Sequence, residues 1–236
     1  MKVEIWSDIA CPFCYIGKAH FQKALASFQN IKDVDVVYRC FQLDPDYKHK
    51  DGETVITYLT DMKGMSVEHV KQMTTHIEQM AKDAGITINF NTNIPANTLD
   101  AHRLILLATQ EHKQEAIVEA LFEAHFTNGK NIEEKNVLKE IGLSAGLSES
   151  QLNTVLDSDA YAYEVKQDIL ESRNIGVRGV PFFLFNRKYA ISGAQPVDTF
   201  IAALKQSFEE WRMEQPTIVD LNASAGGVCN DDNCSI

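Results

Sequence analysis

The sequence predicts an α/β protein in which a strand, a helix and a second strand precede a long helical block, two further strands and a last helix. Three observations lead to this prediction. Apolar residues alternate near the N-terminus, recur every three or four residues through the middle of the chain, and form a bulky β-rich run near the C-terminus. A chain of 236 residues, 44% of them hydrophobic, suffices for one elaborated domain or two.

The first predicted elements are a strand from Lys2 to Asp8 and an amphipathic helix directly after it. In the strand, Val3 and Ile5 share one side, as the alternation of side chains in a strand requires. The helix carries apolar residues at helical spacing, namely Phe21, Ala24, Leu25 and Phe28. Extending this stripe toward the N-terminus places Cys14 on the buried side of the helix.

The helix begins at the motif Cys11-Pro12-Phe13-Cys14. Cys11 falls at its N-terminal edge, where unpaired N–H groups and the positive end of the helix dipole stabilise an anion. Lowering a thiol pKa from about 8.5 to about 6 raises the reactive thiolate fraction at pH 7 from roughly 3% to roughly 90%. The pattern predicts an exposed, attacking Cys11 and a sheltered, resolving Cys14, with Pro12 in the first helical turn.

A Cys-x-x-Cys pair can also be half of a structural zinc site. No second Cys-x-x-Cys or His pair offers further ligands at the usual spacing, although Cys229 and Cys234 contribute in principle. We therefore expect redox chemistry at Cys11 and Cys14, with no metal and no cofactor. Cys40, in the second predicted strand, is expected to be a buried, inert thiol.

The remaining elements follow from periodicity and capping. A second strand is predicted from Val34 to Leu43, and strand signals then nearly vanish until about Asn174. Helices are predicted from Ser66 to Gly85, from near Asn97, over Ile117 to Ala124, over Val137 to Ile141, from Ser148 with Gln151 as a capping box, and from Asp159 to about Ser172. A hairpin of Phe182 to Phe185 and Tyr189 to Ile191, a helix opened by Pro196 and a hinge at 224–227 complete the chain.

Charge and cysteine content limit the class of partner. Lys and Arg number 22 against 33 Asp and Glu, a formal net charge of −11, so neither nucleic acid nor a membrane surface is an expected partner. No run approaches the ~20 apolar residues of a membrane span, and the N-terminus shows no signal-peptide pattern. We expect a cytoplasmic protein whose five cysteines are not a structural disulfide framework.

Three segments resemble the DsbA/FrnE-like family of thiol-disulfide oxidoreductases: SDIACPFCYIG at 7–17, GVRGVPFF at 176–183 and SGAQP at 192–196. With the order of elements, the resemblance covers about residues 1 to 213. It implies a thioredoxin-like domain interrupted by an all-helical insertion domain. We assign residues 1–43 and 165–213 to the first, 44–164 to the second, and 214–236 to a flexible C-terminal tail.

The resemblance also implies roles for single residues. Val180-Pro181 would have a cis peptide bond facing the cysteines, and the backbone of Val180 would pair with extended substrate. Pro12, Phe13 and Val180 would tune the redox potential. Cys229 and Cys234 match a C-terminal Cys-x4-Cys of the FrnE-like branch.

We hypothesise that Cys229 and Cys234 exchange disulfides with Cys11 and Cys14. The 18 residues from Trp211 to Cys229 span up to about 60 Å when extended, so contact is feasible. The alternative is a tail that oxidises incidentally or binds metal adventitiously.

Three residues near the motif allow two roles each. Asp8 could assist proton transfer to the buried thiol or make a cap or loop hydrogen bond. His102 and Arg103 lie in a stretch that resembles helical-domain segments near the active site of the family, and they could line the cleft or only pack the helix.

These features predict a thiol-disulfide oxidoreductase or isomerase that acts on protein disulfides. Its partners would be protein or small-molecule thiols and disulfides, together with an upstream redox partner. The motif leaves the direction of electron flow open. One alternative is a kappa-type glutathione transferase or 2-hydroxychromene-2-carboxylate isomerase, which shares the insertion but typically has serine in place of Cys11 and uses glutathione. Another is a non-catalytic module that binds unfolded chains.

Overall fold

The computed structural model describes residues 1–214, 229–230 and 233–234. A four-stranded sheet with the order β2-β1-β3-β4 organises the first of these ranges. The central strand β1 (Lys2–Ser7) pairs in parallel with β2 (Asp35–Cys40) and antiparallel with β3 (Phe182–Phe185), which pairs antiparallel with β4 (Tyr189–Ser192). The predicted α/β class and the predicted hairpin are confirmed.

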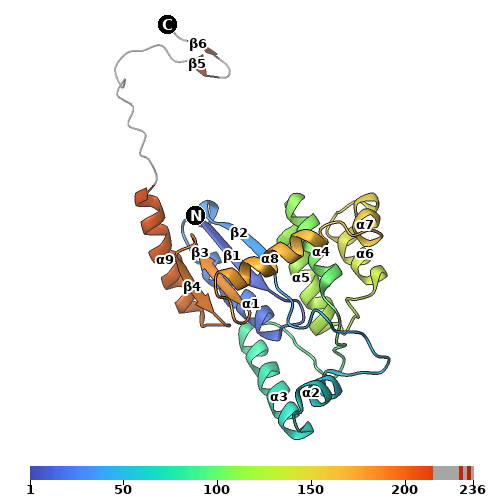
Figure 1. The fold of residues 1–236 in the computed structure, drawn as a ribbon. Coiled ribbons are helices and arrows are strands. Elements are labelled where there is room, and N and C mark those ends of the chain that lie inside the picture. The colour runs from blue at the N-terminus through green and yellow to red at the C-terminus, as the bar shows by residue number, and fades with distance from the viewer. Residues whose placement is uncertain (215–228, 231–232, 235–236) are drawn as a thin grey trace.

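Helices cover both faces of the sheet (Figure 1). On one face, α1 (Pro12–Ala26) packs against α9 (Val197–Glu214), and the Phe21 ring lies 5.4 Å from that of Phe183 and 5.7 Å from that of Phe200. On the other face, the indole N–H of Trp6 donates to the Asp168 carbonyl of α8 (Ala162–Asn174) at 3.1 Å. The sheet therefore lies between two layers of helices.

The segment between β2 and α8 is helical, as predicted (Figure 1). Its elements are α2 (Val55–Lys63), α3 (Val67–Ala84), α4 (Leu99–Gln110), α5 (Gln114–Phe122), the π-helical turn η2 (Glu123–Thr127), α6 (Lys135–Ser144) and α7 (Glu149–Leu156). Helices α4 to α7 cluster together, whereas α2 and α3 form a separate pair, and α3 packs against α1. A short 3₁₀ helix, η1 (Ile31–Asp33), precedes β2.

The capping predictions are confirmed. Ser66 caps α3 by accepting from the His69 N–H, and Gly85 ends that helix in the left-handed conformation. Ser148 and Gln151 form the predicted capping box of α7. The second strand is shorter than predicted, because after Cys40 the chain leaves the sheet.

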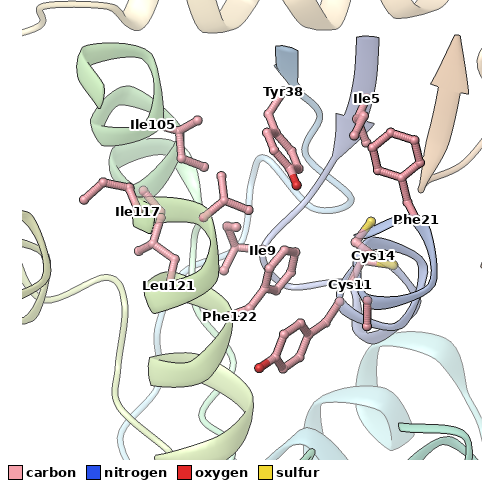
Figure 2. Packing of buried hydrophobic residues seen from close by; sticks show 14 of the residues in the cluster. Ile5, Ile9, Cys11, Cys14, Phe21, Tyr38, Ile105, Ile117, Leu121 and Phe122 are labelled. Atoms are coloured by element: carbon pink, nitrogen blue, oxygen red, sulfur yellow. The ribbon is translucent and has the colours of Figure 1, made fainter. Parts of the chain in front are cut away.

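One hydrophobic core joins the sheet, α1 and the helical block. Figure 2 shows Ile5 and Phe21 on one side and Ile105, Ile117 and Leu121 on the other, with Tyr38 of β2 and Ile9 between them. The predicted boundary between residues 164 and 165 falls inside α8, and the division into domains stays a prediction. None of the described helices has the length and apolar character needed to cross a membrane.

Candidate active site

Both cysteines of the motif lie at the start of α1, which follows the C-terminal end of β1 (Figure 2). Cys11 is the N-cap residue, with extended backbone dihedrals, and Pro12 is the first helical residue, as predicted. Proline suits this position because the first N–H groups of a helix have no partner within it. The Cys14 N–H donates to the Cys11 carbonyl at 3.0 Å, which closes a tight turn between the thiols.

Cys11 is less accessible than the sequence predicts. Only 4% of its surface is exposed, because chain segments far away in the sequence form walls around it. Its thiol donates to the Val180 carbonyl, with 3.6 Å between sulfur and oxygen. The peptide bond between Val180 and Pro181 is cis. The prediction of an exposed Cys11 is therefore wrong for the free protein, although the residue lines a cleft.

Cys14 lies behind Cys11 with 1% of its surface exposed, as the helical stripe predicts. Its sulfur accepts a hydrogen bond from the Asp8 N–H at 3.5 Å. Burial raises the pKa of the Cys14 thiol well above its usual value, and the neighbouring Cys11 raises it further. Cys14 is therefore protonated at rest, and it must lose its proton before it can attack.

Asp8 anchors the loop between β1 and α1 as a buried carboxylate. One of its oxygens accepts from the Leu43 N–H at 2.7 Å, and the other accepts from the Ala10 N–H at 3.3 Å and lies 3.4 Å from Nε2 of His102. Burial raises the pKa of Asp8, but His102 and the Leu43 N–H together lower it below its usual value. The predicted loop hydrogen bond of Asp8 is confirmed.

The two roles weighed for His102 and Arg103 are now distinguished. His102 is buried beside Asp8 and does not line the cleft. Arg103 is also buried, and its guanidinium donates to the Val155, Ser158 and Ala160 carbonyls. It therefore ties α4 to the segment between α7 and α8.

A cleft of about 450 Å³ opens beside Cys11. Its walls come from the motif, from helices α2 and α3, from the loop before α4, from η2 and from the loop that holds Val180. Most of the lining side chains are apolar: Pro12, Phe13, Leu43, Val55, Leu59, Met73, Ile77, Phe90, Pro95, Ala96, Phe126 and Val180. Such a surface suits an apolar ligand group next to the Cys11 sulfur.

Polar groups occupy a few places in this cleft. Asp44 accepts from the Tyr58 hydroxyl at 2.6 Å, and Asp8 lies at the floor. His125, in the π-helical turn, is 2% exposed, and its Nδ1 atom has no hydrogen-bond partner among the described residues. Burial lowers the pKa of His125 to about 4, so the ring is neutral at pH 7.

Sequence reasoning missed much of this wall. It singled out no helix over residues 55–63, because the β-branched run at its start does not favour a helix. The available signal was Thr54, which forms a capping box with Thr57. The π-helical turn and the position of His125 left no comparable signal, because both depend on packing between α5 and distant loops.

The second cysteine pair is described only in its backbone. Strands β5 (Cys229–Asn230) and β6 (Asn233–Cys234) pair antiparallel, with Cys229 opposite Cys234. The predicted hinge at 224–227 and the rest of 215–228 lie outside the described residues, as do the side chains of this pair. Among the residues that the structure describes, no three or more His, Cys, Asp or Glu side chains are grouped to hold a metal ion.

The fold and the paired thiols at the start of α1 define a thioredoxin-fold protein with a helical insertion. Residues 2–205 match the model of the DSBA-like thioredoxin domain, and the chain belongs to that family. Its fold is similar to that of the probable DsbA oxidoreductase SCO1869 from Streptomyces coelicolor. The two are 37% identical with a TM-score of 0.84, and the match covers 100% of this chain and 99% of the other.

Two more distant structures share the fold alone. A 2-hydroxychromene-2-carboxylate isomerase is 15% identical, with a TM-score of 0.67 and coverage of 92% of this chain and all of the isomerase. The cytosolic disulfide reductase DsbM from Pseudomonas aeruginosa is 18% identical, with a TM-score of 0.62 and coverage of 89% and 100%. A second structure of DsbM contains glutathione. One scaffold thus hosts several chemistries, so the activity of this chain must be argued from its site.

Proposed function

We propose that this protein is a thiol-disulfide oxidoreductase that acts on protein disulfides, with Cys11 as the attacking and Cys14 as the resolving thiol. The observation that carries the proposal is the division between the two sulfurs. Cys11 lines the cleft, whereas Cys14 is sealed behind it under the Asp8 N–H. Only Cys11 has a path to an incoming disulfide.

In the first step the Cys11 thiolate attacks one substrate sulfur. The substrate S–S bond breaks, a bond between Cys11 and that sulfur forms, and the other substrate sulfur leaves as a thiolate that takes up a proton. In the second step Cys14 gives up its proton and attacks the Cys11 sulfur, which releases the second substrate thiolate. The protein loses two electrons and the substrate gains them. The same steps in reverse oxidise a substrate dithiol.

Val180 and Pro181 support this chemistry from the opposite wall. The Val180 carbonyl holds the Cys11 thiol at 3.6 Å, which keeps the sulfur at the edge of the cleft. We propose that the backbone of Val180 pairs with an extended substrate segment. Pro12 and Phe13 are the positions that we expect to tune the redox potential, because they lie between the thiols, and Phe13 is 37% exposed at the surface.

We propose cytoplasmic residence and a reductase or isomerase direction. The support is the fold shared with a cytosolic disulfide reductase. Cys229 and Cys234 are proposed to exchange disulfides with Cys11 and Cys14. Mapping of alkylated cysteines in partly oxidised protein tests the exchange, and the complete lack of mixed disulfides between the pairs would contradict it.

Insulin reduction tests the central proposal. The wild-type protein should accelerate insulin reduction by dithiothreitol, and the Cys11→Ser variant should lose this acceleration. Cys40→Ser is the matched control, because Cys40 is buried and lies outside the cleft, so that variant should retain the rate. Unchanged activity in Cys11→Ser would contradict the proposal. An inactive wild type that still suppresses aggregation of unfolded chains would favour a binding module.

A further inference from the structure

We infer that the cleft beside Cys11 selects its substrate by charge. It favours uncharged or cationic amide-bearing disulfides, such as those in neutral polypeptide segments, over anionic ones such as oxidised glutathione, and His125 hydrogen-bonds the bound amide. The inference rests on the proposed disulfide chemistry of Cys11 and adds the class of substrate that this chemistry takes.

The charges around the cleft are all of one sign. Among the residues that the structure describes, the acidic groups that line the cleft are Asp8 and Asp44, and no Lys or Arg side chain lines it. Arg178 precedes the lining residue Gly179 in the chain, but it is exposed and not part of the wall. An anionic ligand would therefore meet the Asp44 carboxylate with no Lys or Arg in the wall to pair with, whereas Asp8 is 1% exposed and already accepts from two backbone N–H groups.

Asp44 is the acidic side chain of the cleft that has no described cation beside it. Its carboxylate accepts from the Tyr58 hydroxyl at 2.6 Å, and no described cation forms an ion pair with it. Glu53 lies nearby and accepts from the hydroxyl of the lining residue Tyr47 at 2.8 Å, but Lys50 pairs with it at 3.1 Å, so it adds little net charge. Like charges in a partly desolvated cleft repel strongly, and the repulsion weakens with salt.

His125 supplies the polar contact. Its backbone carbonyl accepts from the Asn93 side chain at 2.9 Å, and its ring meets Phe126 edge-on at 4.6 Å, which fixes the imidazole beside the cleft. Nδ1 is nevertheless left without a partner in the described structure. A buried polar atom without a partner destabilises the free protein, so a ligand that bonds to it gains affinity.

A peptide amide can form a hydrogen bond with Nδ1 of His125 in either tautomer of the imidazole. A neutral imidazole has one donor and one acceptor nitrogen, and a peptide amide both donates and accepts. Burial holds His125 neutral, so the ring brings no positive charge that would attract a carboxylate. Oxidised glutathione carries more carboxylates than ammonium groups and is disfavoured, whereas an uncharged peptide segment with apolar side chains matches the walls.

A set of matched disulfides tests the charge selection. The reduced full chain, with Cys229→Ser and Cys234→Ser in every arm, is mixed with three reagents of one frame: the disulfides of N-acetylcysteine amide (neutral), N-acetylcysteine (dianionic) and N-acetylcysteine 2-aminoethylamide (dicationic). Each rate constant for oxidation of the protein is divided by the constant for the same reagent with dithiothreitol, which removes intrinsic reactivity. We expect the normalised rate constant of the neutral reagent to exceed that of the dianionic reagent by about 30-fold, because the dianion is repelled by the acidic cleft. This ratio of rate constants should fall in 1 M salt, which screens the repulsion.

Two pairs of variants assign the effect to residues. Asp44→Asn keeps an acceptor for Tyr58 and should lower the ratio of the neutral to the dianionic rate constant about fivefold. Asp46 is an exposed carboxylate outside the cleft, so Asp46→Asn should leave this ratio unchanged. His125→Leu should lower the rate of the neutral amide reagent about tenfold relative to diethyl disulfide, which has no polar group. His76→Leu, on the exposed side of α3, is its control.

The outcomes separate this inference from the proposed function. Equal normalised rate constants for the neutral and dianionic reagents, in low salt and with wild-type cleft residues, would overturn charge selection while leaving the chemistry of Cys11 intact. A protein that no reagent oxidises, or one in which Cys11→Ser reacts as fast, would overturn the proposed function itself. If Asp44→Asn fails to fold, the salt dependence of the unaltered cleft still decides the question.

Discussion

The thiols of Cys11 and Cys14 are chemically equal, but the first turn of α1 places them in different environments, one on a cleft side and one on an inner side. The cleft side is mostly apolar and holds Cys11, and there a ring nitrogen of His125 has no partner within the part of the chain that the structure describes. The inner side holds Cys14, and there Asp8 receives two backbone N–H groups and lies against His102. The cleft side is open to a ligand, whereas on the inner side the Asp8 carboxylate is held by backbone N–H groups and Nε2 of the buried His102 makes no hydrogen bond among the described residues.

This difference explains how a short motif can give its two cysteines separate roles. Both residues belong to one helical turn, so the helix alone does not distinguish them strongly. The remaining distinction comes from other segments, since Val180 and α2 border Cys11 and the loop at Asp8 covers Cys14. Attack and resolution are thus assigned by the tertiary structure around the turn.

Replacing either thiol should change the rate of disulfide reduction more than any other substitution in the site. Cys14→Ser should lower multiple-turnover insulin reduction at least about 1,000-fold, because the resolving step is lost, yet the variant should accumulate mixed disulfides on Cys11. Mass spectrometry of acid-quenched, alkylated protein identifies the trapped sulfur. The trapped partners also name the substrate and the direction of electron flow.

Cys11→Ser is the informative counterpart, because Cys14 is then the remaining thiol of the motif. It should trap no substrate, since Cys14 is buried and its pKa is raised. Equal trapping by the two variants would show that the cleft does not distinguish the thiols, and the assignment of roles would have to be withdrawn.

The cleft side should also be the part of the site that is sensitive to mild acid. The pKa of His125 is lowered to about 4 by burial, below the ~6.5 of an unfolded chain, so the unfolded state binds more protons between these values. Stability should therefore fall as the pH drops from about 6.5 to about 4, by roughly 3 kcal/mol in total. Urea unfolding at a series of pH values measures this slope.

His125→Gln removes the titrating group and should flatten that part of the profile, even if its stability at pH 7 is lower. His76→Gln serves as the control, because His76 is exposed on α3. A profile equally steep in His125→Gln and wild type would assign the acid sensitivity to other groups.

The inner side should instead be sensitive to loss of a carboxylate. Asp8→Asn leaves part of a buried hydrogen-bond set unsatisfied and should destabilise the protein by about 2 kcal/mol at pH 7, whereas Asp44→Asn in the cleft should change stability by less than about 0.5 kcal/mol. The pKa of Asp8 is lowered in the folded state, so its contribution is present above the unfolded value of about 4 and is lost as the pH falls further. Unfolding free energies of Asp8→Asn and wild type should therefore converge as the pH falls through the lowered pKa of folded Asp8. A difference that persists there would mean that the charge is not the cause.

Local patterns in the sequence were sufficient to predict the elements that build the inner side. Alternation predicted β1, the helical stripe predicted that Cys14 is buried, and short-range capping predicted the ends of α3 and α7. These features depend on residues a few positions apart, so a single sequence contains them. Pro12 at the first helical position is a signal of the same kind.

The cleft side could not be predicted in the same way. Its walls combine segments that are distant in sequence, and the burial of Cys11 depends on where those segments pack. Tyr58 lies on a helix whose β-branched start is not typical of a helix, and His125, which lines the cleft, belongs to a π-helical turn. Tertiary packing determines such features, and local secondary-structure propensity does not predict how distant segments pack.

Gly17 offers the smallest but most selective way to alter the boundary between the two sides. It is a buried residue of α1, three positions after Cys14, and a Cβ atom there would come within 2.9 Å of Cγ of Pro181. Because this distance is shorter than side chains tolerate, Gly17→Ala should push the loop of Val180 away from Cys11. The variant should be less stable by about 1 kcal/mol, since the higher helix propensity of alanine offsets only part of the clash. The rate of mixed-disulfide formation at Cys11 should fall several-fold. The rate of resolution by Cys14, measured from the decay of a preformed mixed disulfide, should be unchanged, because the Asp8 N–H contacts Cys14 on the inner side of the turn. If both steps slow equally, the two environments are mechanically coupled through α1, and the wall at Val180 does not act on Cys11 alone.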